Sequence, residues 1–275
     1  MRSVVLAAVI ALAAPAAGIA ASGPASAAPS TKPYIVVVTA GTSPTANAEA
    51  HGVTPTQVYT SALVGYAADL TKTQVKELRA DTAIESVTAD TTTVVDPGVV
   101  AVVPQPAQVT AVVVQRVGAL ASSTAKIDGI DERVDVDVAI LDTGIDSTHP
   151  DLNVVGGFDC VNGTTIEDVM GHGTMVGGLV GAIDNSIGHV GVAPGARLWS
   201  IRVGTKNGSV HKSSLLCGID WVTAHAGTIE VANLSLAVPE KISACDTKST
   251  KPLHAAACAS VAAGVTYVAA AGNEK

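Results

Sequence analysis

In the carboxyl-terminal part of the chain, short apolar runs alternate with stretches of helical periodicity. The apolar runs predict one strand that ends at Leu141 and further strands at residues 196–203, 231–236 and 265–270. Helices are predicted between them, at residues 172–180, 215–222 and 253–263. This alternation is typical of an α/β fold with a doubly wound parallel sheet and helices on both faces. Ligands of such sheets bind beyond the carboxyl ends of the strands.

Residues 34–90 predict a smaller unit with its own order of elements. Strands are expected at residues 35–38 and 84–87, with a hairpin at residues 58–67. Thr71-Lys72-Thr73-Gln74 matches a capping box that begins a helix. The order β, short helix, β, β, α, β is that of a ferredoxin-like unit. Residues 91–106, which are rich in Thr, Val and Pro, then predict a linker.

Residues 1–27 have the features of a secretory signal peptide. Arg2 precedes an apolar stretch from Val4 to Ala20, and Ala25-Ser26-Ala27 offers small residues to a signal peptidase. A proline and a glycine interrupt the apolar stretch, which disfavours a membrane anchor. No later segment is long and apolar enough to cross a bilayer. We therefore expect a secreted, extracellular protein without a membrane partner.

Composition and charge narrow the classes of partner. Of the 275 residues, 48% are hydrophobic and only 15% are charged. A chain of this length and composition can bury a large hydrophobic core. The apolar residues are mainly Ala and Val, which suit a closely packed α/β core. The net charge is −8 and there is no long basic run, so we expect no nucleic-acid partner.

The four cysteines are expected to form two disulfides. Export places them in an oxidising compartment, and no C-x-x-C spacing indicates a zinc site. Four cysteines allow three pairings. Cys245 with Cys258 closes a short local loop, which leaves Cys160 with Cys217.

Asp142 ends the apolar run Val138-Ala139-Ile140-Leu141 and is followed by Thr143-Gly144. A buried carboxylate is costly unless something hydrogen-bonds or neutralises it. Asp142 could therefore cap a turn. It could also belong to an aspartic protease, but the chain has one D-T-G, so that site would need a dimer. A third hypothesis makes Asp142 the acid that orients a catalytic histidine.

His172 favours the third hypothesis. It stands between two glycines in "GHGTMVGGLVG", at the beginning of a predicted helix. An isolated histidine is more often structural, and it can also be a metal ligand. A histidine paired with a buried carboxylate can act as a general base. The acid holds the imidazole in one tautomer and stabilises the imidazolium formed in catalysis.

Asn273 follows the last predicted strand, in the sequence Ala270-Ala271-Gly272-Asn273. Asparagine at the end of a strand is most often a turn former. Its carboxamide N–H can also donate a hydrogen bond to an oxyanion when it is directed into a cleft.

With these residues, the chain resembles the subtilisin-like serine proteases, the peptidase S8 family. The motifs D-T-G-I-D-S-x-H-P-D-L, H-G-T-x-V-x-G, G-V-A-P, N-x-S-L and A-A-G-N-E occur in the family's order. The resemblance covers residues 107–275, the first part of a catalytic domain. Residues 34–90 resemble the inhibitor-type (I9) propeptide of the same enzymes, with residues 91–106 as the maturation region.

The resemblance implies a role for each matching residue. Asp142 matches the triad acid, His172 the general base and Asn273 the oxyanion donor. The substrate-binding positions are Gly208, Ser209 and Val210 on an edge strand, and Ser235, Leu236, Ala237, Ala270, Ala271 and Gly272 around the specificity pocket. Ala237 replaces a usual glycine, which implies a narrower pocket. Met175 departs from the family's second histidine, with no evident catalytic consequence.

The resemblance also implies a structural Ca²⁺ site around the segment Ala182–Pro194. Its oxygen ligands would be the carbonyl groups of Ile183, Ile187 and His189 and the side chains of Gln108, Asp151 and Asn185. Hard oxygen donors suit Ca²⁺. The alternative is an ordinary surface loop.

The family's nucleophilic serine, in the motif G-T-S-x-A, has no counterpart in these 275 residues. We therefore expect an inactive fragment of a zymogen with exposed core surface. Two classes of function remain. One is a serine endopeptidase that cleaves proteins and peptides, with the propeptide as its own inhibitor and folding aid. The other is a non-catalytic protein whose propeptide-like unit binds or inhibits a protease.

Overall fold

The computed structural model describes residues 29–95, 107–237, 244–246 and 251–271. The chain divides into residues 1–30 and residues 31–275, and the described helices and strands belong to the second unit. The predicted signal peptide and residues 96–106 of the predicted linker lie outside the described residues. Within the described ranges, no helix combines the length and hydrophobicity that a membrane span requires.

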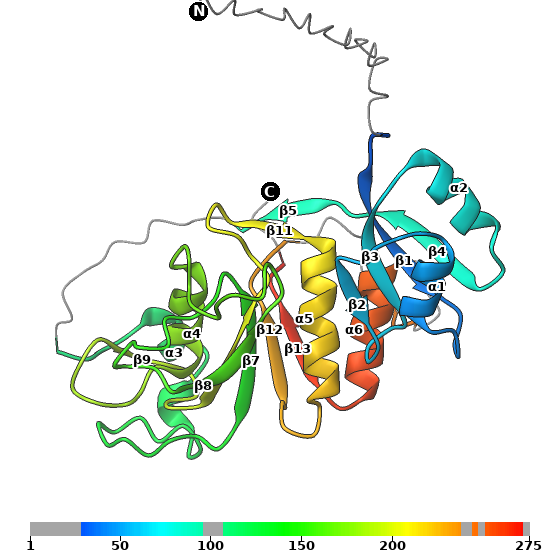
Figure 1. The fold of residues 1–275 in the computed structure, drawn as a ribbon. Helices are drawn as coiled ribbons and strands as arrows, with labels where there is room; N and C mark the ends of the chain where they lie inside the picture. Colours follow the sequence, from blue (N-terminus) through cyan, green and yellow to red (C-terminus); the bar gives the residue numbers. More distant parts are fainter. Residues whose placement is uncertain (1–28, 96–106, 238–243, 247–250, 272–275) are drawn as a thin grey trace, which may run out of the picture. The chain divides into compact units, whose positions relative to one another are not determined.

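Residues 31–95 contain the predicted propeptide (residues 34–90) and are called the pro-segment below. They begin with a four-stranded antiparallel sheet covered by two helices (Figure 1). The strand order is β2-β3-β1-β4, which together with the order along the chain confirms the ferredoxin-like prediction. The elements are β1 (Lys32–Val38), α1 (Pro44–Ala50), β2 (Gln57–Tyr59), β3 (Gly65–Leu70), α2 (Lys72–Ala80) and β4 (Ile84–Ala89).

Helix α2 begins where the sequence predicted. The Thr71 hydroxyl accepts a hydrogen bond from the Gln74 amide, and the Gln74 side chain accepts one from the Thr71 amide. Val75 and Leu78 lie on the face that the helix buries, in one cluster with Val36 of the sheet. Burial of a side chain such as Leu78 stabilises the fold by ~1.5–3 kcal/mol.

The second sheet has five parallel strands in the order β13-β12-β7-β10-β8. Three longer helices accompany it, so the doubly wound α/β prediction is confirmed. The elements are β7 (Asp137–Asp142), β8 (Val154–Asp159), α4 (His172–Gly181), β10 (Arg197–Arg202), α5 (Lys212–Ala224), β12 (Val231–Leu234), α6 (Pro252–Ala262) and β13 (Thr266–Ala269).

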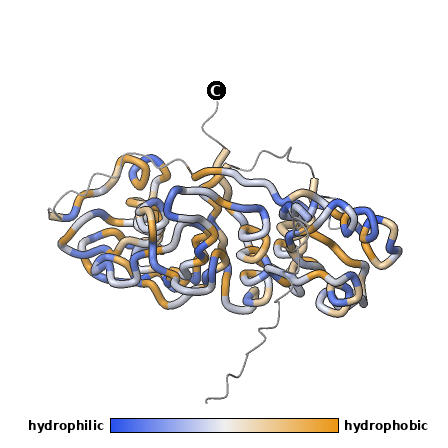
Figure 2. The backbone as a smooth tube through the Cα atoms, turned by 45° about the horizontal axis from the view of Figure 1, so that its top comes forward, coloured by the Kyte–Doolittle hydropathy of each residue, from blue (hydrophilic) through white to orange (hydrophobic). Residues whose placement is uncertain are grey.

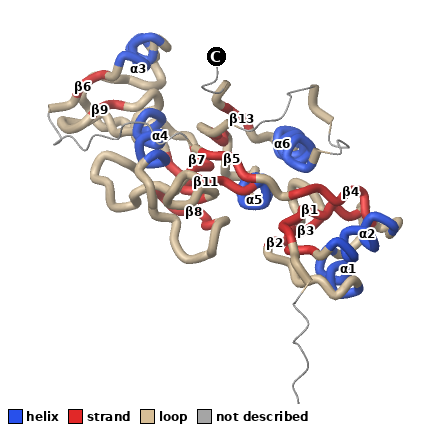
Figure 3. Tube along the Cα trace, turned by 90° about the horizontal axis from the view of Figure 1, so that it is seen from above, coloured by secondary structure: helices blue, strands red, loops and turns tan. Residues whose placement is uncertain are grey.

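Residues of the central strand β7 alternate between the two faces of the sheet. Ala139 and Leu141 pack in the cluster that contains α5 and α6, whereas Val138 and Ile140 pack in the cluster that contains α4. Seen from above, α4 lies on one side of the strands and α5 and α6 on the other (Figure 3). In Figure 2, hydrophobic stretches of the backbone (orange) alternate with hydrophilic ones (blue) along the chain. The strand is buried throughout, as expected for the centre of a parallel sheet.

The remaining elements are short. Strand β5 (Thr92–Val94) pairs with β11 (Ser209–His211) in antiparallel fashion, and β6 (Val109–Thr110) pairs with β9 (His189–Val190) in parallel. Helix α3 (Val112–Arg116) and a 3₁₀ turn (Ala119–Ala121) precede the central strand. Residues 92–94 were expected in a linker, but they form a strand because they pair with β11. The sequence did not predict this strand, because its partner lies far away along the chain.

Strand β8 was not predicted from the sequence, because two glycines interrupt its pattern. Gly156 packs against the ring of Trp199, and a Cβ atom at Gly156 would lie 2.9 Å from that ring. The glycine is therefore required by the packing of β8 on β10.

Both disulfides join the expected pairs. Cys160, just after β8, is bonded to Cys217 on α5, and Cys245 is bonded to Cys258 on α6. The first bond ties the edge strand of the sheet to the helix that covers it.

The α4 side of the parallel sheet carries an open apolar groove of about 600 Å³. Several of its aliphatic residues are half exposed, Val268 most of all at 52%. Its lining comes from α4, the sheet and nearby loops, and includes Val176, Leu179, Val192, Val231, Asn233, Ser235 and Val268.

Candidate active site

The carboxylate of Asp142 and the ring of His172 meet at the carboxyl end of β7. His172 Nδ1 lies 2.8 Å from Asp142 Oδ1 and 2.9 Å from Oδ2, and the Thr143 amide donates to Oδ1 at 2.7 Å. Asp142 is fully buried and His172 is 9% exposed. The buried carboxylate therefore has hydrogen-bond partners. It accepts from the amide of the following turn, at Thr143, and it also pairs with the ring of His172.

Glycines make this close approach possible. Gly171, the N-cap of α4, has a left-handed φ of 104°. A Cβ atom on the next glycine, Gly173, would lie 2.0 Å from the Gly144 carbonyl oxygen and 3.1 Å from Cβ of Asp142. The sequence G-H-G thus lets the beginning of α4 pack directly against the loop that follows β7.

Asp168 is a residue of the site that the sequence did not reveal. Its Oδ1 accepts hydrogen bonds from Thr143 Oγ1 and from the amides of Met170 and Gly171, while its Oδ2 accepts from Thr174. Burial alone would raise the pKa of the Asp168 carboxyl, but these hydrogen bonds outweigh it and hold the pKa below its usual value. The ionised carboxylate ties the loop after β7 to the first turn of α4.

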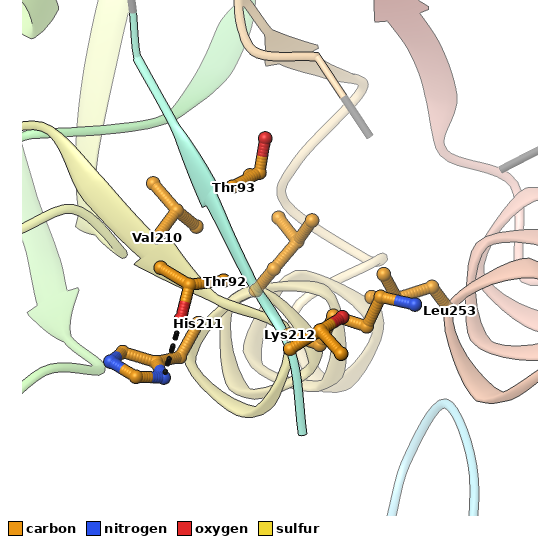
Figure 4. Close-up of a pocket in the computed structure, with 8 residues that line it drawn as sticks. Thr92, Thr93, Val210, His211, Lys212 and Leu253 are labelled. Carbon is orange, nitrogen blue, oxygen red and sulfur yellow. Dashed lines mark hydrogen bonds between the residues drawn. The ribbon is translucent and has the colours of Figure 1, made fainter. Parts of the chain in front are cut away.

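Strand β11 has an antiparallel partner in the pro-segment strand β5, with Val94 opposite Ser209 and Thr93 opposite Val210. The Val95 amide donates to the Gly208 carbonyl oxygen at 2.7 Å. A small pocket here is lined by Thr93, Lys212 and Leu253 (Figure 4). Leu215 lines it as well. Of the predicted substrate-binding residues, Ser209 and Val210 lie in β11, and Gly208 precedes the strand with a left-handed φ of 76°.

The two stretches expected around the specificity pocket come together. The Ala270 amide donates to the Leu234 carbonyl oxygen at 3.0 Å, which brings Ala270 and Ala271 beside Ser235 and Leu236. The Ala237 carbonyl oxygen accepts a hydrogen bond from Thr93 Oγ1 at 2.5 Å. Gly272 and Asn273 lie outside the described residues.

The residues expected at the calcium site also converge. Asn185 Nδ2 lies 2.7 Å from Asp151 Oδ1, and the Asn185 amide lies 2.5 Å from Gln108 Oε1. The pairing of β6 with β9 places Val109 opposite His189, while Ala107 forms a bridge with Ile187. The Ile183 amide donates to the Asp151 carbonyl oxygen. Among the described residues, no cluster of three or more His, Cys, Asp or Glu side chains could hold a metal ion.

Comparison with known families agrees with this fold. The model of the subtilase family (Peptidase_S8) matches residues 134–275, and the model of peptidase inhibitor I9 matches residues 38–96. The chain belongs to the subtilase family.

Curated relatives are similar over half of the chain. Subtilisin E of Bacillus subtilis (strain 168) is 42% identical over 141 residues, which cover 50% of this chain and 34% of the relative. Subtilisin Savinase of Lederbergia lenta is 44% identical over 139 residues, 50% of this chain and 48% of the relative. This chain therefore spans between a third and a half of the length of these relatives. A protein that only inhibits proteases is not favoured by a subtilase match of this kind.

Proposed function

We propose that this chain is the amino-terminal part of a secreted subtilisin-like serine endopeptidase that is made as a zymogen. The buried Asp142–His172 pair at the carboxyl end of β7 is the observation that carries the proposal. Proteins and peptides would be its substrates.

In this mechanism each residue has one task. Asp142 accepts a hydrogen bond from the Nδ1–H of His172, which leaves Nε2 unprotonated as the base that takes the proton of a serine hydroxyl. The same carboxylate stabilises the imidazolium that forms, and its burial strengthens the interaction. Asn273 would donate its carboxamide N–H to the oxyanion of the tetrahedral intermediate.

We further propose that residues 1–275 alone do not cleave peptide bonds, because the pair needs a nucleophile from a G-T-S-x-A motif that these residues lack. The apolar groove beside α4 supports this proposal. A surface of this kind is typical of a buried interior, and the matched relatives are two to three times longer than the matched segment.

The pro-segment would be the protease's own inhibitor and folding aid. Its last strand, β5, covers the edge of β11 by strand addition, which is a common way of binding extended peptides. A substrate cannot enter while β5 remains there.

Calcium would stabilise the loop between α4 and β10. Asp151 is 1% exposed, and burial raises the pKa of its carboxyl. Asn185 links it to Gln108, because Asn185 Nδ2 donates to Asp151 Oδ1 and the Asn185 amide donates to Gln108 Oε1. The side-chain oxygens of these three residues would turn toward a hard cation when it binds. Residues 1–27 would direct the protein to export.

Activity of the full-length protein tests the main proposal. His172→Ala should lower hydrolysis of casein by ~10⁶-fold, because it removes the base. Asp142→Asn should lower it by roughly 10⁴-fold, because His172 is then held in the wrong tautomer. His225→Ala, which alters an exposed histidine at the end of α5, is the matched control and should retain activity. Equal activity of His172→Ala and the parent protein would remove His172 from the mechanism.

A further inference from the structure

Two glycines flank His172, and the backbone amide of each is hydrogen-bonded to a different side chain. The Gly171 amide donates to Asp168 Oδ1 at 2.8 Å, and the Gly173 amide donates to Thr143 Oγ1 at 3.0 Å. Glycine has no side chain with which to cap a helix, and the N-cap residue of α4, Gly171, makes no capping bond of its own. The backbone on both sides of His172 is therefore fixed by residues outside the helix.

The two side chains that hold these amides are bonded to each other and to the acid of the pair. Thr143 Oγ1 donates to Asp168 Oδ1 at 2.8 Å, and the Thr143 amide donates to Asp142 Oδ1 at 2.7 Å. Because Asp142 also accepts from His172, the bonds form a closed ring that runs from Asp142 through Thr143 and Asp168 to the beginning of α4. Asp142 and Thr143 are fully buried, where hydrogen bonds are stronger than in water.

Asp168 also places a negative charge at the amino terminus of α4. Its Oδ2 accepts from the Thr174 amide at 2.8 Å and from the Thr174 hydroxyl at 2.6 Å. Thr174 is the third residue of α4, so its amide is one of those that a helix leaves without an acceptor. A carboxylate at this end of a helix offsets the partial positive charge there. His172 is the first residue of the same helix, so this charge favours the imidazolium that forms in catalysis.

We infer that Asp168 is a positioning residue for the proposed general base. It keeps the ring of His172 in line with Asp142 by holding the Gly171 amide and the Thr143 hydroxyl, and it takes no part in proton transfer itself. Without its carboxylate, the first turn of α4 loses its acceptors, and a small displacement of a catalytic group can cost about 10²-fold in rate. This inference rests on the proposed protease function and adds a residue that sets the geometry of its base.

Kinetics of the full-length protein, after removal of its pro-segment, test the inference. Asp168→Ala should lower kcat for casein by ~10²-fold and change KM by less than ~3-fold, because the base is displaced while the edge of β11 is not. Asp168→Asn keeps one acceptor oxygen and the shape of the side chain, and it should lower kcat by ~10-fold. Equal kcat values of Asp168→Ala and the parent protein would overturn the inference.

Thr143 provides a second test in the same assay, because its hydroxyl links Asp168 to the Gly173 amide. Thr143→Val removes the hydroxyl and keeps the shape, and it should lower kcat by ~10-fold. Thr143→Ser keeps the hydroxyl and should stay within ~2-fold of the parent protein. The double variant Asp168→Ala/Thr143→Val should lose less than the product of the two single effects, because both act on one network. A loss equal to the product contradicts the inference.

The pH dependence of kcat/KM separates positioning from a general loss of stability. Its acidic limb reports the base of the free enzyme, and loss of a nearby negative charge disfavours the imidazolium. In Asp168→Asn the limb should therefore move to lower pH by ~0.2–0.7 pH units. Asp137→Asn is the matched control, because Asp137 is also buried but lies at the opposite end of β7. That end is ~16 Å away, beyond the screening length of physiological salt, so kcat and the limb should stay unchanged. An equal shift in both variants contradicts the inference.

A further measurement uses the 275-residue chain and needs no catalysis. The Nδ1 proton of His172 exchanges slowly with water only while the ring stays bonded to the buried Asp142, so its NMR signal reports the position of the ring. The signal should persist in the parent chain and in Asp137→Asn, and it should be lost in Asp168→Ala. A signal that persists in Asp168→Ala would overturn the inference. An absence of hydrolysis by the parent full-length protein would instead overturn the proposed function and leave this measurement unaffected.

Discussion

Asp90 of the pro-segment accepts two hydrogen bonds from Ser213, the second residue of α5. The Ser213 hydroxyl lies 2.6 Å from Asp90 Oδ2, and the Ser213 amide lies 3.1 Å from Oδ1. The N-cap residue of this helix, His211, makes no capping hydrogen bond with its side chain. Asp90 therefore supplies the acceptor that the beginning of α5 lacks, and its negative charge suits a helix amino terminus.

Helix α5 also binds the pro-segment in the opposite sense, through the side chain of Asp220. The Asp220 carboxylate accepts from the backbone amides of Thr60, Ser61 and Ala62 at 2.7–3.2 Å. Tyr59 adds a buried hydrogen bond to the Ser213 carbonyl oxygen. The pro-segment and α5 thus provide hydrogen-bond partners for each other's backbone groups. Asp90 and Asp220 can each be substituted separately to test the two interactions.

Asp220→Asn should loosen the pro-segment without unfolding α5. A carboxylate that accepts several amide hydrogen bonds contributes ~1.5–3 kcal/mol, so exchange of the amides of residues 60–62 should become about 10-fold faster or more. Hydrogen exchange of the 275-residue chain measures this. Asp69→Asn, at an exposed acid of β3, is the control and should leave those amides protected. Unchanged exchange in Asp220→Asn would show that the three hydrogen bonds do not hold the loop.

The Asp168 carboxylate should make the free energy of unfolding depend on pH. Its pKa lies below the usual value of 3.8 in the folded protein, so the unfolded chain takes up the proton first as the pH falls. The stabilisation is present above the unfolded pKa and is lost as the pH falls through the lower, folded value. Urea unfolding at several pH values should therefore give the largest loss of stability for Asp168→Asn near pH 6 and the smallest near pH 2. A loss that is constant with pH would mean that its charge is not involved.

The sequence predicted the Asp142–His172 pair and both sheets because each depends on local patterns: an apolar run that ends in an acid, glycines around a histidine, a capping box. It did not predict Asp168, β5 as a strand or the Asp90–Ser213 cap. These depend on partners that only the tertiary fold brings together; Asp90 and Ser213 are 123 residues apart. Strand β8 was missed because the fit of Gly156 against Trp199 replaces the usual hydrophobic signal.

The two disulfides should contribute unequally to stability. Cys160 and Cys217 are 57 residues apart, whereas Cys245 and Cys258 are 13 apart. Constraint of the unfolded chain grows with loop length, which gives about 4 kcal/mol for the longer loop and about 3 kcal/mol for the shorter one. Unfolding of the double variant Cys160→Ser/Cys217→Ser should therefore need less denaturant than that of Cys245→Ser/Cys258→Ser. The opposite order would mean that native contacts, and not the length of the loop, decide the effect.

Calcium should stabilise the protein through Asp151. Millimolar Ca²⁺ should raise the unfolding temperature of the parent chain by several degrees, since a ligand at about 100 times its Kd contributes ~2.7 kcal/mol. A chelator should reverse the rise, and Mg²⁺ should not reproduce it, because Mg²⁺ demands a tighter octahedral site. Asp151→Asn should abolish the Ca²⁺-dependent rise, while the exposed Asp69→Asn should retain it. In chelator, Asp151→Asn should be no less stable than the parent chain, because the buried carboxylate then has no cation to balance it. A rise that survives in Asp151→Asn would place the cation elsewhere.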